Sequence, residues 1–231
     1  MPRHFHPLAP NTLALALALA GCGHGRMLPS ASANVVPGAP AAASAEENGV
    51  AISADGDDWK GRPADLPQRL TPLKVRIVNH SGRPIEILYE RFVLTGDRGH
   101  RYQPLPPVPI DHQKPLDGTG TVRPIFASAS FYVAQRYGDI YPSLPPWSRS
   151  LPRDARFSEQ QYRRWPDDLP TREMQRLGLP EGVLADGGEI SGYLFFEDAT
   201  RREGRLTFSA ALDDGDGGGS VAELEIPFRV E

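Results

Sequence analysis

Three stretches near the end of the chain alternate apolar and polar residues with a period of two, and this pattern constrains the fold more than any other feature. They cover residues 190–196, 206–212 and 222–230. Such alternation is typical of strands that bury one face and leave the other in solvent. Three of them in succession predict an antiparallel sheet whose apolar face packs on a second layer.

A second group of strand patterns lies far earlier in the chain. Residues 73–77 alternate Leu, Val and Ile with Lys and Arg, and short apolar runs follow at 85–87 and 92–94. The turn residues Asn, Ser and Gly at 79–82 separate the first two runs. We therefore predict that residues 72–103 form an antiparallel meander of three or four strands.

Six or seven strands in two groups favour a mainly β protein built from two packed sheets. An immunoglobulin-like antiparallel β-sandwich is the expected architecture, and a small open barrel is the alternative. The chain has one cysteine, so the Cys…Trp…Cys signature of immunoglobulin domains is missing.

The long interval between the two groups predicts an insertion at about 104–188. It opens with the proline-rich run 104–109, which favours an extended polyproline-type segment. Residues 157–165 predict a short helix. A second helix is expected after Thr171 as N-cap, ending before Gly178. We expect this partly helical insertion to pack on the sandwich.

The segment 22–68 has a different composition. It is rich in Ala, Pro, Gly and Ser, with few apolar residues larger than alanine. Such a composition buries too little surface to offset the entropy of ordering. We therefore predict a disordered tether at 22–68 and a folded domain at 69–231. An alanine-rich helix at 39–45 is the alternative, although Pro40 and Ser44 interrupt it.

The first 21 residues have the organisation of a secretory signal. A positive start precedes the Leu/Ala run 13–20, which is followed by small residues and is too short to span a membrane. A short buried helix is the alternative. Cys22 is the only cysteine, so it has no intramolecular disulfide partner. A nucleophilic role would require a nearby base and a rigid frame, which a glycine-flanked position does not provide.

The stretch Leu19-Ala20-Gly21-Cys22 resembles the lipobox of bacterial lipoproteins. The resemblance implies cleavage between Gly21 and Cys22 and acylation of the Cys22 thiol with two or three chains, enough for stable attachment. Because Gly23 rather than Asp follows the cysteine, the resemblance further implies the outer membrane of the cell envelope, on its periplasmic or surface face.

The charge balance limits the partners. The chain has a net charge of −4, with 25 Lys and Arg against 29 Asp and Glu. This mildly acidic balance gives no electrostatic footprint for nucleic acid and predicts no basic patch for anionic lipid. The membrane is therefore expected to be contacted through the N-terminal lipid alone.

No motif in the sequence predicts catalysis, a metal site or a cofactor. The loop 213–220 approaches the spacing of a calcium-binding loop, but a glycine occupies its fifth ligand position, so a solvated hairpin turn is favoured. The neighbouring Asp111 and His112, with His100, are the strongest acid and imidazole groups. If the three met in a pocket, they would support a hydrolase acting on a glycan or peptide polymer of the envelope.

The insertion is rich in aromatic residues, and Arg163 and Arg164 lie among them. Exposed aromatics beside arginine are typical of protein or glycan contacts, whereas buried ones would simply cover the sandwich. The candidate contact residues are Tyr141, Trp147, Tyr162, Arg163, Arg164 and Trp165.

The runs 179–184, 187–188 and 192–196, together with Ile226-Pro227-Phe228, are similar to the C-terminal halves of uncharacterised bacterial envelope lipoproteins, a resemblance that implies no activity. The sequence thus predicts a lipid-anchored envelope protein, not an enzyme, with a binding or scaffolding role toward an envelope protein or glycan. The envelope hydrolase is the alternative.

Overall fold

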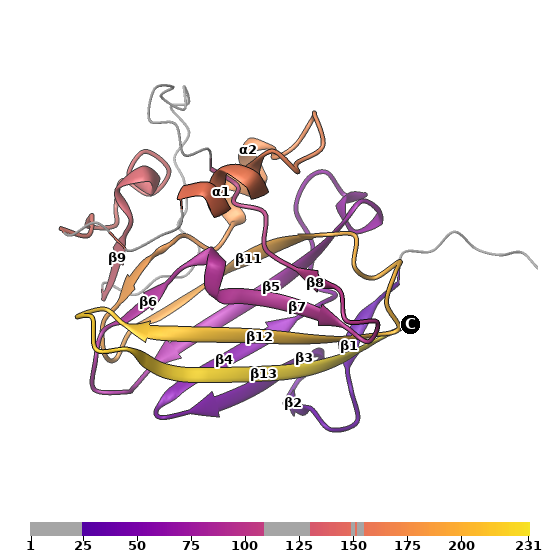
Figure 1. Cartoon of the computed structure of the whole chain (residues 1–231), viewed down its shortest axis with the longest axis horizontal. Helices are drawn as coiled ribbons and strands as arrows, with labels where there is room; N and C mark the ends of the chain where they lie inside the picture. Colours follow the sequence, from indigo (N-terminus) through magenta and orange to yellow (C-terminus); the bar gives the residue numbers. More distant parts are fainter. Residues whose placement is uncertain (1–24, 109–129, 149–150, 152–154) are drawn as a thin grey trace, which may run out of the picture.

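The computed structural model of the chain describes residues 25–108, 130–148, 151 and 155–231. Two antiparallel sheets pack face to face in this part of the chain, which confirms the predicted mainly β sandwich with a long, partly helical insertion (Figure 1). The signal segment, Cys22, Asp111 and His112 lie outside the described residues.

The five-stranded sheet has the order β11-β5-β4-β3-β2. Its strands are β2 (Asn34–Val36), β3 (Ala39–Glu47), β4 (Val50–Asp55), β5 (Leu70–Asn79) and β11 (Glu189–Glu197).

The eight-stranded sheet follows the path β1-β13-β12-β6-β10-β9, and β7 pairs with both β12 and β8. Its strands are β1 (Met27–Pro29), β6 (Ile85–Ile87), β7 (Phe92–Gly96), β8 (Arg101–Tyr102), β9 (Phe131–Val133), β10 (Gly182–Leu184), β12 (Arg205–Asp214) and β13 (Ser220–Val230).

The helices lie in short connections and in the insertion. They are η1 (Leu66–Gln68), η2 (Tyr89–Arg91), η3 (Gln135–Tyr137), α1 (Ala155–Tyr162) and α2 (Arg172–Leu177). Helix α2 is confirmed with its predicted cap, because the Thr171 hydroxyl accepts a hydrogen bond from the Met174 backbone amide and Gly178 follows the last turn. Helix α1 begins two residues before the predicted start and ends three residues before the predicted end.

The prediction of a disordered tether is wrong for the described part of 22–68. Strand β1 joins one sheet, and β2, β3 and β4 form most of the other. The alanines of β3 are small enough to sit against the core, and Ala43 is fully buried. Val50, Ile52 and Ala54 alternate on the inner face of β4. The entropy cost of ordering this segment is therefore offset by its pairing with neighbouring strands rather than by the burial of bulky side chains.

The predicted meander at 72–103 is also wrong in its pairing, although its strands are present. Strand β5 lies in the five-stranded sheet, whereas β6, β7 and β8 lie in the other. Buried Asn79 fixes the crossing, because its side-chain amide donates to the Arg83 carbonyl at 2.7 Å and to the Leu184 carbonyl at 3.0 Å. A period of two indicates which face of a strand is buried, but it does not indicate which strand pairs with it.

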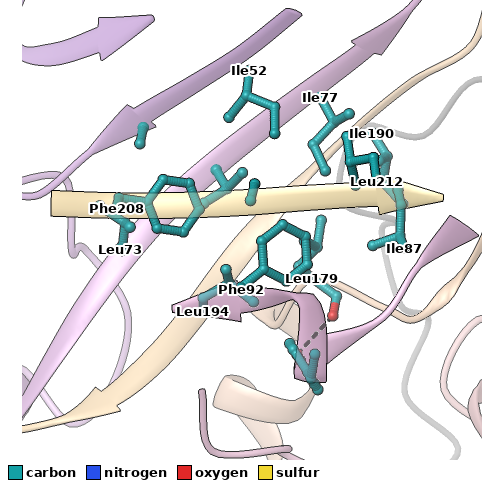
Figure 2. Close-up of a cluster of buried hydrophobic side chains, with 14 of the residues drawn as sticks. Ile52, Leu73, Ile77, Ile87, Phe92, Leu179, Ile190, Leu194, Phe208 and Leu212 are labelled. Atoms are coloured by element: carbon teal, nitrogen blue, oxygen red, sulfur yellow. Dashed lines mark hydrogen bonds between the residues drawn. The ribbon is translucent and has the colours of Figure 1, made fainter. Parts of the chain in front are cut away.

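The main core lies between the two sheets. Ile52, Ile77 and Ile190 from one sheet meet Phe208 and Leu212 from the other (Figure 2). Phe92 stacks on Phe208 with 6.0 Å between ring centroids.

A second apolar cluster lies on the outer face of β11, where Tyr193 and Phe195 project away from the main core. Trp165 and Met174 cover these two rings, and helices α1 and α2 lie over this part of the sheet (Figure 1). Both faces of β11 are thus buried, one by the opposite sheet and one by the insertion.

Candidate functional site

Two of the six predicted contact residues belong to the protein interior. Trp165 is 8% exposed, and its indole Nε1 donates to the Pro106 carbonyl at 2.9 Å. Tyr141 is 2% exposed, and its hydroxyl donates to the Arg176 carbonyl at 2.9 Å. Their polar atoms are satisfied internally, so these two aromatics act in packing and are not available on the surface.

Three further candidates lie on α1 or directly after it. The Arg164 guanidinium forms two hydrogen bonds with the Glu197 carboxylate, at 3.0 and 2.5 Å, and so ties the end of α1 to the end of β11. Arg163 pairs with Glu159 one turn away on an exposed surface, where such pairs contribute little to stability. Tyr162 is half-buried against the second cluster. Arg164 and Tyr162 therefore hold the insertion on the sandwich, whereas Arg163 pairs only within the insertion.

The remaining candidate, Trp147, takes part in an aromatic pair at the edge of the eight-stranded sheet. Its ring lies 5.7 Å from that of Tyr132 in an edge-on arrangement, and Tyr132 on β9 is 36% exposed. The Trp147 backbone amide donates to the Val133 carbonyl at 2.8 Å, which fixes the residue beside β9. We call Tyr132 and Trp147 the edge aromatic pair.

A buried ion pair supports the segment that carries the edge aromatic pair. Arg136 and Glu181 pair with side-chain exposures of 2% and 4%, and the Arg136 guanidinium lies 5.1 Å from the centre of the Tyr137 ring. Glu181 also accepts a hydrogen bond from the Tyr89 backbone amide at 2.9 Å. A buried charge requires such partners, so the turn after β9 is fixed to both β10 and η2.

Glu203 forms the middle of a polar centre that no sequence motif predicts. Its side chain is fully buried and accepts from the Tyr102 hydroxyl at 2.9 Å and from the Arg98 backbone amide at 3.2 Å, while His100 Nδ1 lies 2.7 Å away. The hydrogen bond with His100 is the main cause that lowers the pKa of Glu203 to about 2. Burial, helped by Glu203, raises the pKa of Tyr102 to about 12.

The Glu203 centre joins two loops at one end of the sandwich. His100 and Arg98 belong to the turn between β7 and β8, whereas Glu203 lies between β11 and β12. Each oxygen acceptor of the carboxylate is used by the protein itself. The centre therefore fixes the loops. His100, which the hydrolase alternative needs beside Asp111 and His112, is paired with Glu203.

The outer face of the five-stranded sheet carries a hollow of about 390 Å³ lined by charged side chains. Arg76 pairs with Glu189 at 2.6 and 2.7 Å, and Lys74 pairs with Asp58 at 2.5 Å. Burial raises the pKa of Asp55 beside them. Val36, Ala39 and Ala42 also line the hollow, and the two cations are already paired with carboxylates of the protein.

The loop 213–220 is a hairpin turn, as predicted. The Asp214 backbone amide donates to the Gly219 carbonyl at 2.8 Å, and its carboxylate accepts from the Asp216 amide at 2.8 Å. Within the described residues, no group of three His, Cys, Asp or Glu side chains has the arrangement of a metal site, and no helix is long and apolar enough to cross a membrane.

No family model, curated protein or solved structure matches this chain.

Proposed function

We propose that this protein is a lipid-anchored protein of the cell envelope, attached through Cys22 to the outer membrane, with a non-catalytic binding or scaffolding role. The edge aromatic pair is the observation that carries the binding role. Tyr132 and Trp147 place two large rings at the outer edge of the eight-stranded sheet. Aromatic side chains on a rigid, partly exposed support are the typical anchors of protein contacts.

The edge aromatic pair favours side-chain recognition over strand addition. Val133 on β9 is already bridged by Pro146 and hydrogen-bonded by Trp147, so part of the outer backbone edge is occupied. A partner would therefore contact the rings rather than extend the sheet. We favour an envelope protein as the partner, and a glycan is the other outcome of the test below.

The membrane attachment is tested by the replacement Cys22→Ser in intact cells. We expect the protein to leave the membrane fraction, because the acyl chains are its proposed anchor. The replacement Ser220→Cys, at an exposed position on the other side of the domain, is a control that adds a thiol without removing Cys22. Unchanged membrane association of Cys22→Ser would contradict the anchor.

The binding role is tested by in-cell crosslinking from a photoreactive residue at position 132. We expect one specific product that is lost in Trp147→Ala and kept in Arg163→Ala, which changes an exposed residue directly after helix α1. A sugar-containing product would redirect the proposal to a glycan. An identical set of crosslinked products in both variants, or the absence of any specific product, would contradict the role of the edge aromatic pair.

A further inference from the structure

The described chain begins at the end of the sandwich where it also finishes. The Arg26 amide donates to the Glu231 carbonyl at 2.7 Å, and the Glu231 amide donates back at 3.0 Å. Gly25 lies so close to Thr200 and Val230 that a Cβ at this position would contact both. The connection 198–204, the turn between β7 and β8 and the C-terminus share this end (Figure 1). We call it the terminal end.

The terminal end is close to Cys22 along the chain. Only three residues separate Cys22 from Arg26, the first of the described residues whose backbone is hydrogen-bonded to a distant part of the chain. Four residue steps span at most about 14 Å. A ten-residue strand such as β12 is about 34 Å long. If Cys22 carries the lipid, the terminal end stays near the headgroups, whereas the opposite end can lie far from them.

The terminal end is also rich in arginine. Its arginines are Arg26, Arg98, Arg101, Arg201, Arg202, Arg205 and Arg229. Four of them are paired with carboxylates: Arg26 with Asp57, Arg201 with Asp198, Arg205 with Asp97 and Arg229 with Glu231.

The other three, Arg98, Arg101 and Arg202, are exposed and form no ion pair with any residue that the structure describes. Arg98 and Arg202 lie in the two loops that Glu203 joins, and Arg101 is the first residue of β8, directly after His100. Guanidinium groups bind phosphate through parallel N–H donors, so this set is suited to lipid headgroups. The expectation of no basic surface follows from the net charge and overlooks this local excess.

We infer that the terminal end docks on anionic phospholipid headgroups, with Arg98, Arg101 and Arg202 contacting the phosphates and the sandwich standing end-on. This inference rests on the proposed anchor at Cys22. Because the whole chain carries −4, the remaining surface is repelled by the same lipids, which favours one orientation. In this orientation the membrane holds the domain directly at its surface rather than at the end of a long tether.

The orientation can be measured on the lipidated full-length protein in vesicles of phosphatidylethanolamine and phosphatidylglycerol. Cys22 is the only native cysteine and its thiol would be acylated, so one introduced cysteine takes a fluorescent label alone. Gly204→Cys places a label at the terminal end, and the backbone at Gly204 does not have a positive φ that would strain a cysteine. Ser220→Cys places a label near the opposite end of β12. A headgroup-quenching lipid then reports which label lies at the surface.

We expect strong quenching at position 204 and little at position 220. Each basic residue contributes roughly a fivefold gain at an anionic surface, so Arg98→Glu with Arg202→Glu should lower the docked-to-undocked ratio by at least about 25-fold. The matched control, Arg83→Glu with Arg172→Glu, changes the charge equally at exposed positions elsewhere and should leave quenching unchanged.

Three results would overturn the inference. Equal quenching at both positions would contradict the end-on orientation. Quenching at 204 that survives the Arg98 and Arg202 reversal would show that the short link alone, without arginine contacts, holds the end at the surface. A protein that does not associate with vesicles at all would contradict the proposed anchor, and the inference would fail with it.

Discussion

The N-terminal strands β1 to β4 and the C-terminal strands β11 to β13 build the same sandwich from opposite kinds of sequence. The C-terminal strands bury large apolar residues, among them Phe196, Phe208 and Phe228. Strand β3 has the sequence APAAASAEE and buries only Ala42 and Ala43. Yet β3 pairs with β4 over six residue pairs, and β4 with β5 over six more.

The difference shows that a strand can be ordered by its neighbours. Ala43 is fully buried in the main core although its side chain is a single methyl group. Strand β4 supplies the larger residues Val50 and Ile52, and β3 is held between β4 and β2. A small-residue segment is therefore compatible with a core position when the adjacent strand supplies the buried area.

The largest effect is expected in the patterned region. Phe208 is 1% exposed and stacks on Phe92, so Phe208→Ala should lower the free energy of unfolding by about 3–5 kcal/mol. Urea denaturation of the chain without residues 1–21 measures this, with exposed Tyr132→Ala as the control. A loss no greater than the control's would contradict the central position of β12.

Met27 tests the N-terminal region in the same way. It is fully buried in the main core only five residues after Cys22. Met27→Ala should cost about 2–5 kcal/mol. Met27→Leu, which keeps the volume, should cost less than about 1.5 kcal/mol. If the segment were a tether, both variants would have the stability of the wild type in urea denaturation.

Gly49 sharpens the comparison at a single turn. It has φ +81°, and an added Cβ would lie 2.5 Å from the His80 carbonyl oxygen, so Gly49→Ala should cost about 1–3 kcal/mol. Gly38 has φ +80° with open space around it, so Gly38→Ala should carry the conformational strain alone. Thermal unfolding compares the two, and equal losses would exclude a close approach of the β3–β4 turn to His80.

The last prediction concerns a pH dependence at the terminal end, where the two regions meet. The lowered pKa of Glu203 stabilises the fold above its ordinary pKa of 4.5, and this contribution is lost as the pH falls toward about 2. Glu203→Gln should lower the urea midpoint at pH 7 and flatten its decline between pH 4.5 and 2. Glu46→Gln, at an exposed position, should keep the wild-type slope. An unchanged slope in Glu203→Gln would contradict the role of this carboxylate.

Part of the fold follows directly from the sequence. The strands β5, β11, β12 and β13 and helix α2 are readable because a period of two or a capping residue marks each of them. Strands β3 and β4 are hidden by their composition, although Asn48-Gly49 is a strong hairpin signal that forms a two-residue turn between Glu47 and Val50. The pairing of strands cannot be predicted in this way, because an alternating pattern shows which face of a strand is buried and does not show which strand lies beside it.

The candidate site is readable only in part. The edge aromatic pair contains one residue from the predicted contact set, Trp147, while Tyr141 is buried in the main core and Trp165 in the second cluster on β11. Glu203 meets His100 across more than a hundred residues of sequence, and no local motif marks such a contact. The arginines of the terminal end are likewise brought together by the fold from strand ends and loops that are far apart in the sequence.

Native-state hydrogen exchange tests most directly whether the N-terminal segment belongs to the sandwich. We expect the paired amides of β3 and β4 to be protected to a similar degree as those of β11 and β12, because local opening of either group would expose the same core. Rapid exchange of all amides in residues 27–55, beside slow exchange in 189–230, would contradict the account and restore the tether.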